Sequence, residues 1–200
     1  MDKEIRRALE GLLARDLDAL TGAAPYVTAR PGAVVRTWRL PAGDVEALVR
    51  WGLPARRDPR AASHNPTAAF QDGPRPMLTV PGAGDADGAG GENRERAAYR
   101  LADSRLREYG AVEGAGTVFG VPRPGNTTGG PVNTSVAAYV ETVWRWICFC
   151  DVVDPLEERG DHDTFAWCLD RFAAWCVERD PEATALSATG QSWWESLTLS

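Results

Sequence analysis

The segment at residues 132–135 constrains the fold of this chain more than any other stretch. Val132 is suited to an extended strand, and Asn133, Thr134 and Ser135 can each accept a hydrogen bond from a backbone N–H. Apolar side chains then recur at helical spacing, at positions 136, 140, 143, 144 and 147. The pattern predicts a strand that ends directly at a capped amphipathic helix, running from residue 136 to residue 150.

Three other stretches also predict helices. Residues 2–20 place Ile and Leu side chains on one face, with Asp2 as the cap. A shorter helix is predicted from Asp44, as its cap, to residue 51, because Gly52-Leu53-Pro54 is typical of a helix end. Residues 163–179 carry a wide apolar stripe that stops at Asp180-Pro181.

Short runs of branched and aromatic residues predict strands at 34–40, 77–80, 109–113 and 117–121. The sequence therefore predicts an α+β fold, a single domain over residues 1–200 in which a mainly antiparallel sheet of four or more short strands packs with several helices. Its parts are an N-terminal helix (1–22), a flexible glycine-rich loop (82–96), and a C-terminal part (132–200) with the cap, two long helices and an aromatic end that contains Trp193-Trp194.

Charge is distributed unevenly along the chain. The net charge is −6, but residues 1–100 carry +2 and residues 101–200 carry −8. Binding to nucleic acid is therefore disfavoured, because it needs clustered basic side chains. No apolar run approaches a membrane-spanning length, and residues 1–14 are too charged for a signal peptide. We expect a cytoplasmic protein that binds neither nucleic acid nor a membrane.

Residues suited to catalysis are few. His162 lies between Asp161 and Asp163, but adjacent loop residues rarely converge on a metal without a third ligand. Cys148 is expected at a helix C-terminus, where the helix dipole disfavours a thiolate. The sequence therefore predicts no metal, cofactor or catalytic residue. A small hydrolase or transferase that uses His64 or His162 remains the alternative.

Several short motifs occur here in the order and spacing of a known family. They are Gly52-Leu53-Pro54, Tyr99-Arg100-Leu101, residues 110–113, residues 116–122, residues 132–135, Tyr139-Val140, Trp144-Arg145-Trp146, Asp180-Pro181 and Trp193-Trp194. Through these motifs, residues 30–195 resemble the SUKH superfamily of immunity proteins, most closely its fourth subfamily. The chain departs from the family pattern in the glycine-rich loop near residue 85 and at Ala102, where glycine is expected.

The resemblance implies a non-enzymatic protein of a bacterial polymorphic toxin system that binds a cognate toxin domain and blocks it. Many toxin domains of this kind are basic nucleases, and the acidic half of the chain would complement them. We expect the contact surface at an acidic turn made of Asp151, Asp154, Glu157, Glu158, Asp161 and Asp163. A regulatory protein-interaction module unrelated to toxins is a further alternative.

Overall fold

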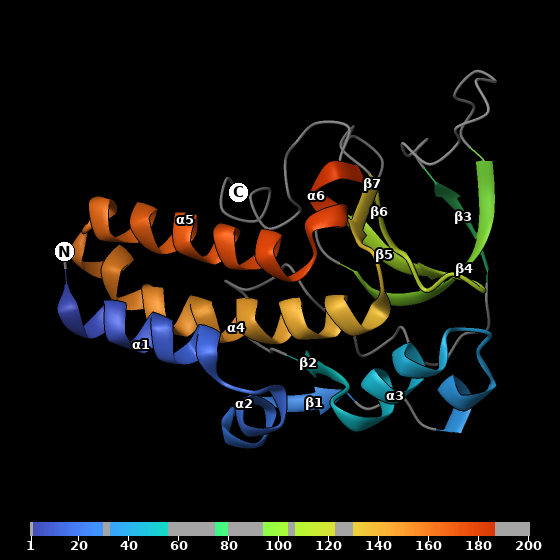
Figure 1. The fold of residues 1–200 in the computed structure, drawn as a ribbon, viewed down its shortest axis with the longest axis horizontal. Coiled ribbons are helices and arrows are strands. Elements are labelled where there is room, and N and C mark those ends of the chain that lie inside the picture. The colour runs from blue at the N-terminus through green and yellow to red at the C-terminus, as the bar shows by residue number, and fades with distance from the viewer. Residues whose placement is uncertain are drawn as a thin grey trace.

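Three helices lie side by side at one end of the molecule, and the larger sheet lies at the other end (Figure 1). The structure is a computed structural model that describes residues 2–29, 33–55, 75–79, 94–103, 107–122 and 130–186. The three helices are α1 (Lys3–Ala14), α4 (Val136–Arg159) and α5 (His162–Arg179). α4 contacts both α1 and α5. The apolar stripes that predicted these helices therefore meet in one hydrophobic core.

α4 is longer than the apolar pattern predicts. We expected it to end at residue 150, but it continues to Arg159 and contains Pro155. Val153 and Leu156 extend its buried stripe, whereas Pro155 is exposed. Proline has no backbone N–H, so one carbonyl of the preceding helical turn lacks its usual donor. On the exposed side of the helix, water can donate a hydrogen bond to that carbonyl instead. Burial of the stripe therefore outweighs the proline, and the prediction that the helix closes at residues 148–150 was wrong.

A five-stranded antiparallel sheet lies near the N-terminal end of α4 (Figure 1). Its strands, in both chain and spatial order, are β3 (Arg75–Thr79), β4 (Arg94–Asp103), β5 (Arg107–Val112), β6 (Val118–Pro122) and β7 (Gly130–Asn133). β5 and β6 form the predicted hairpin, with Ala111 opposite Val118. β7 leads into α4, as the opening motif predicts. The α+β fold with a mainly antiparallel sheet is confirmed.

The remaining elements are shorter. They are α2 (Leu17–Ala23), β1 (Val27–Ala29), the 3-10 helix η1 (Ala33–Thr37), α3 (Ala42–Arg50), β2 (Leu53–Ala55) and α6 (Pro181–Leu186). β1 and β2 pair antiparallel as a small second sheet. Gly52, between α3 and β2, has a φ of 62°, so the predicted glycine stop is confirmed.

Two predicted elements differ from the structure. Residues 34–40 alternate like a strand but include η1, and the Trp38 ring stacks on Tyr99 of the sheet at a centroid distance of 4.5 Å. This contact with a distant residue overrides the local strand pattern. The predicted helix over 2–20 is broken into α1 and α2, because Asp16 accepts a hydrogen bond from the Ala19 N–H at 2.8 Å and so begins a new helix.

Some predicted segments lie outside the described residues. These include most of the glycine-rich loop, whose residues 94–96 belong to β4, and the aromatic end with Trp193-Trp194. Val80, the last residue of the predicted strand 77–80, also lies outside them. Within the described ranges, no helix is both long and apolar enough to cross a membrane.

Candidate functional site

The predicted acidic residues gather where α4 ends and α5 begins, next to the N-terminus of the chain (Figure 1). Asp151, Asp154 and Glu158 lie on α4 at positions i, i+3 and i+7, which share one helix face, and all three are exposed. The expected acidic turn is therefore mostly a helix face, and the prediction of a turn was wrong. Glu157 also belongs to α4, but its side chain lies outside the described part of the structure.

Asp161 and Asp163 stand at the start of α5. Asp161 is its N-cap and accepts a hydrogen bond from the Thr164 N–H at 3.2 Å. The hydrogen bonds from Thr164 lower the pKa of the Asp161 carboxyl. Asp163 is exposed in the first turn, where the helix dipole favours a negative charge. Asp161 therefore has a structural role, while Asp163 presents its charge to solvent.

Asp151 has a partner within the chain. Its carboxylate accepts a hydrogen bond from the hydroxyl of Tyr26, which lies between α2 and β1. Burial, and then the nearby charge of Asp154, raise the pKa of the Asp151 carboxyl. Asp151 thus ties the C-terminal part of α4 to the N-terminal part of the chain, in addition to contributing charge to the surface.

Three of the four arginines of this region pair with carboxylates. Residues 136–179 contain nine acidic and four basic side chains. Arg159 pairs with Asp2 at 3.2 Å, and Arg171 pairs with Glu10 at 3.0 Å, so both bind α1 or its cap. Arg145, the most buried of the four, pairs with Glu141 at 2.9 Å. The outer surface of the α4–α5 hairpin is therefore rich in carboxylates and poor in cations.

The residues considered for catalysis are not gathered into a site. His162 is exposed at the first position of α5, and His64 lies outside the described residues. Cys148 lies in the middle of α4, so it is not at a helix C-terminus as expected. Burial raises the pKa of the Cys168 thiol to about 11, which keeps it protonated near neutral pH. In the part of the chain that the structure describes, no group of three or more His, Cys, Asp or Glu side chains could hold a metal ion.

The N-terminus of α4 holds a buried polar junction that the sequence predicts only in part. Ser135 accepts a hydrogen bond from the Ala138 N–H at 3.1 Å, as the cap prediction requires. Asp44 does not cap its own helix. Its Oδ1 instead accepts a hydrogen bond from the Ala137 N–H at 2.9 Å, and α3 begins at Ala42 without a side-chain cap. A carboxylate more than 90 residues away in sequence therefore stabilises the start of α4, and no local signal reveals this.

Asp180 completes this junction from the other side. It accepts hydrogen bonds from the Thr134 N–H at 2.9 Å, the Thr134 hydroxyl at 2.8 Å and the Asn133 Nδ2 at 3.1 Å. Asn133 and Thr134 were expected to be possible helix caps, but they bind Asp180 instead. The polar residues of the opening motif therefore join β7 to the end of α5.

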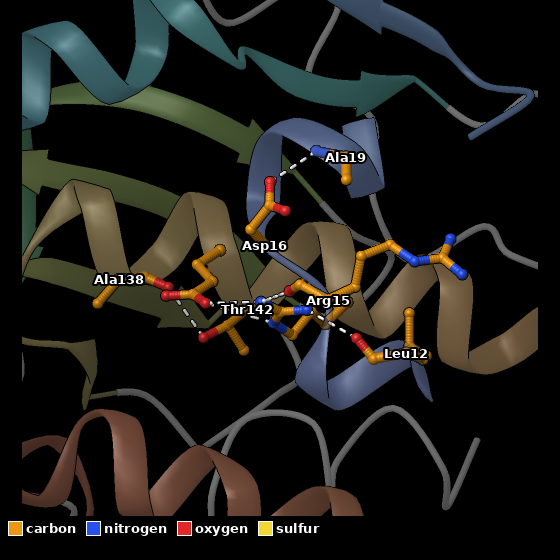
Figure 2. A network of polar contacts seen from close by, with 8 residues as sticks. Leu12, Arg15, Asp16, Ala19, Ala138 and Thr142 are labelled. Carbon is orange, nitrogen blue, oxygen red and sulfur yellow. Dashed lines mark hydrogen bonds and ion pairs between the residues drawn. The ribbon is translucent and has the colours of Figure 1, made fainter. Parts of the chain in front are cut away.

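A second buried polar network surrounds Arg145, which is 1% exposed. Its guanidinium donates hydrogen bonds to the carbonyls of Leu12, at 2.8 Å, and Arg15, at 2.7 Å, and it lies 4.8 Å from the centroid of the Trp175 ring. Figure 2 shows the carbonyls of Leu12 and Arg15 beside α4, near the hydrogen bond that the Ala19 N–H donates to Asp16. Arg145 thus satisfies the carbonyls left open where α1 ends.

The family motifs contact one another in this fold. Trp144 donates a hydrogen bond from its indole Nε1 to the Gly52 carbonyl at 3.1 Å, and Asp180 binds Thr134 as described above. A family model described as SUKH-4 immunity protein matches residues 12–199. The chain belongs to the SUKH-4 immunity protein family. No curated protein and no solved structure matches it.

Several SUKH-4 motifs have structural roles in the described part of the chain. Gly52, Trp144 and Arg145 lie in the interior, and the 132–135 motif holds the start of α4. These residues contribute to the core and to the buried polar bonds.

Proposed function

We propose that this SUKH-4 immunity protein binds a cognate toxin domain and blocks it without catalysing a reaction. The observation that carries the proposal is the family match over residues 12–199. The contact surface that we propose is the acidic surface formed by the residues at the end of the α4–α5 hairpin. These are Asp151, Asp154, Glu157, Glu158, Asp161 and Asp163.

Charge supports a basic partner such as a nuclease domain. A nuclease that binds the phosphate backbone presents basic side chains, because their contacts with phosphates provide much of its affinity. An acidic protein surface attracts that basic surface and speeds association with it. Occupation of the basic surface would exclude the nucleic acid. The α4–α5 hairpin suits this role because Arg159 and Arg171 pair with carboxylates of α1 or its cap, and Arg145 is buried.

The test uses the toxin domain encoded by the neighbouring reading frame, purified as a catalytically inactive variant. Isothermal titration calorimetry with the wild-type chain should show a stoichiometric complex. The variant Asp154→Lys/Glu158→Lys/Asp163→Lys should bind at least roughly 10-fold more weakly, because three attractive charges become repulsive. Asp161 is left unchanged, since its substitution would remove the cap of α5.

The matched control is Glu46→Lys, which reverses an exposed carboxylate on α3. We expect it to bind the toxin domain like the wild type. No binding by the wild-type chain would contradict the proposed function. Binding unchanged in the triple variant would contradict the proposed surface and leave the function standing.

Among the residues that the structure describes, which exclude His64, no geometric observation favours a histidine-dependent hydrolase or transferase. His162 is exposed and precedes the first buried residue of α5, Thr164. We expect His162→Ala to neutralise the toxin as well as the wild type does, measured as survival of cells that express both proteins.

A further inference from the structure

The outer face of α5 is a continuous exposed ridge. Asp163, Ala166, Asp170, Ala174 and Val177 are spaced by three or four residues, so they lie along one side of the helix over four turns. All five are exposed. α5 uses its other faces to pack against α4, α1 and α6. We call these five residues the α5 ridge.

The α5 ridge combines apolar side chains with carboxylates. Val177 is 42% exposed, and it is the one large apolar side chain that the described residues leave exposed. High helix propensity explains Ala166 and Ala174 without any partner. It does not explain Val177, because a β-branched side chain is less favourable than alanine in a helix, and Val177 remains 42% exposed there.

The charges of the α5 ridge all have one sign. Asp163 and Asp170 contribute carboxylates, while the two arginines of α5 lie off the ridge. Arg171 binds Glu10 of α1 at 3.0 Å, and the Arg179 guanidinium lies 5.9 Å from the centroid of the Trp175 ring. Protein interfaces commonly combine an apolar centre with a polar rim. The ridge offers that combination, and all of its charged side chains are carboxylates.

We propose that the α5 ridge is part of the toxin-binding surface, where Val177 contacts an apolar side chain of the toxin domain and Asp163 and Asp170 receive lysines or arginines. This inference rests on the proposed function and adds a location and an apolar component to it. Asp163 belongs both to the ridge and to the acidic surface at the hairpin end, so the two form one continuous area. The occupant that we propose is a basic surface of the toxin domain, because positive charges complement the carboxylates of the ridge.

The test compares two alanines that are exposed on different helices. Ala174→Arg places a long cation in the middle of the α5 ridge, and Ala8→Arg makes the same change on α1. Arginine is a good helix former, so both variants should fold and unfold in urea like the wild type. Ala174→Arg should weaken binding of the inactive toxin domain by at least roughly 30-fold, the loss typical of a substitution at an interface hot spot. Ala8→Arg should bind normally.

A second variant examines the apolar contact alone. Val177→Ala removes two methyl groups without changing charge, and we expect binding to weaken by roughly 5- to 10-fold. Its association rate constant should stay unchanged. Loss of an apolar contact mainly raises the dissociation rate constant, so the complex should last for a shorter time.

The outcomes separate the two proposals. If the wild-type chain does not bind the toxin domain, both the proposed function and the ridge proposal are wrong. If the wild type binds and Ala174→Arg binds equally well, the ridge proposal alone is wrong. The alternative occupant of the ridge is a second copy of this chain, and analytical ultracentrifugation tests for such a dimer. A wild-type dimer that Ala174→Arg dissociates without any loss of toxin binding would also contradict the proposal.

Discussion

Gly116 shows how a single position controls the junction at the start of α4. Its φ is +75°, and a Cβ added there would lie 1.9 Å from Oδ2 of Asp44 and 3.1 Å from Cδ of Pro41. Asp44 is the residue that caps α4 through Ala137. The turn between β5 and β6 therefore approaches α3 too closely for any side chain at this position.

Substitution of this glycine should be costly. We expect Gly116→Ala to lower the free energy of unfolding by about 3 kcal/mol, because a left-handed backbone strain adds to a clash with Asp44. Gly114→Ala is the matched control, since Gly114 has a φ of +82° but no atom within 4 Å of the added Cβ. It should cost about 1 kcal/mol, from strain alone. Urea unfolding followed by tryptophan fluorescence measures both, and equal losses would show that the close approach to Asp44 is unimportant.

The Asp44 carboxyl should give stability a distinct dependence on pH. Burial raises its pKa above the ordinary value of 3.8, against the opposing hydrogen bonds from Ala137 and Val136. The folded protein thus holds this proton more firmly than the unfolded chain. The resulting stabilisation is complete below pH 3.8 and is lost as pH rises through the raised pKa. Relative to Asp44→Asn, the wild type should lose free energy of unfolding as pH rises from about 4 to 7.

Asp161 provides the control of opposite sign. Hydrogen bonds from Thr164 lower its pKa below the ordinary value of 3.8, so its contribution is present above that pH and is lost as pH falls through the lowered value. Relative to Asp161→Asn, the wild type should therefore lose stability in acid. Urea unfolding from about pH 2 to about pH 7 measures both differences, and the same slope for both variants would contradict the assignment.

At the scale of the elements, Arg145 connects α4 to the end of α1. It is 1% exposed and binds the carbonyls of Leu12 and Arg15 as well as the carboxylate of Glu141. We expect Arg145→Met to lower the free energy of unfolding by about 3 kcal/mol, because two buried carbonyls and one carboxylate lose their donor.

Arg179→Met is the matched control for Arg145→Met. Arg179 lies over the same Trp175 ring but is exposed at the end of α5, and its loss should change stability by no more than about 0.5 kcal/mol. Hydrogen exchange should also show that Arg145→Met, unlike Arg179→Met, loses protection first in α1 and α2. Equal stability of the two variants would contradict the role of the buried network.

For the whole molecule, charge should affect how fast a partner binds. Residues 101–200 carry −8, and three of the four arginines of the α4–α5 hairpin pair with carboxylates of the chain. We expect the association rate with the toxin domain to fall about 10-fold from low to physiological ionic strength, because salt screens exposed charges. Stopped-flow fluorescence measures this rate. The triple variant Asp154→Lys/Glu158→Lys/Asp163→Lys should show much less dependence on salt, and a wild-type rate that salt does not change would contradict charge steering.

The sequence by itself determined the elements whose signals are local. The helices α1, α4 and α5, the β5–β6 hairpin and the Gly52 stop follow from apolar periodicity, turn residues and backbone freedom, and their residue patterns also carry the family assignment. Helix ends were less predictable. α4 continues past residue 150 because its buried stripe outweighs Pro155, and this turned the expected acidic turn into a helix face.

Only the tertiary structure decided which polar groups meet. Asp44 was expected to cap its own helix, but it caps α4, and Arg145 satisfies carbonyls more than 120 residues away in the chain. The α5 ridge also emerged only in the fold, because periodicity shows that a helix has two faces but packing decides which residues remain in solvent. Local hydrogen bonds and side-chain spacing depend on residues that are close together in the sequence. Long-range polar pairing and exposure depend on which elements pack together, so no short stretch of sequence contains them.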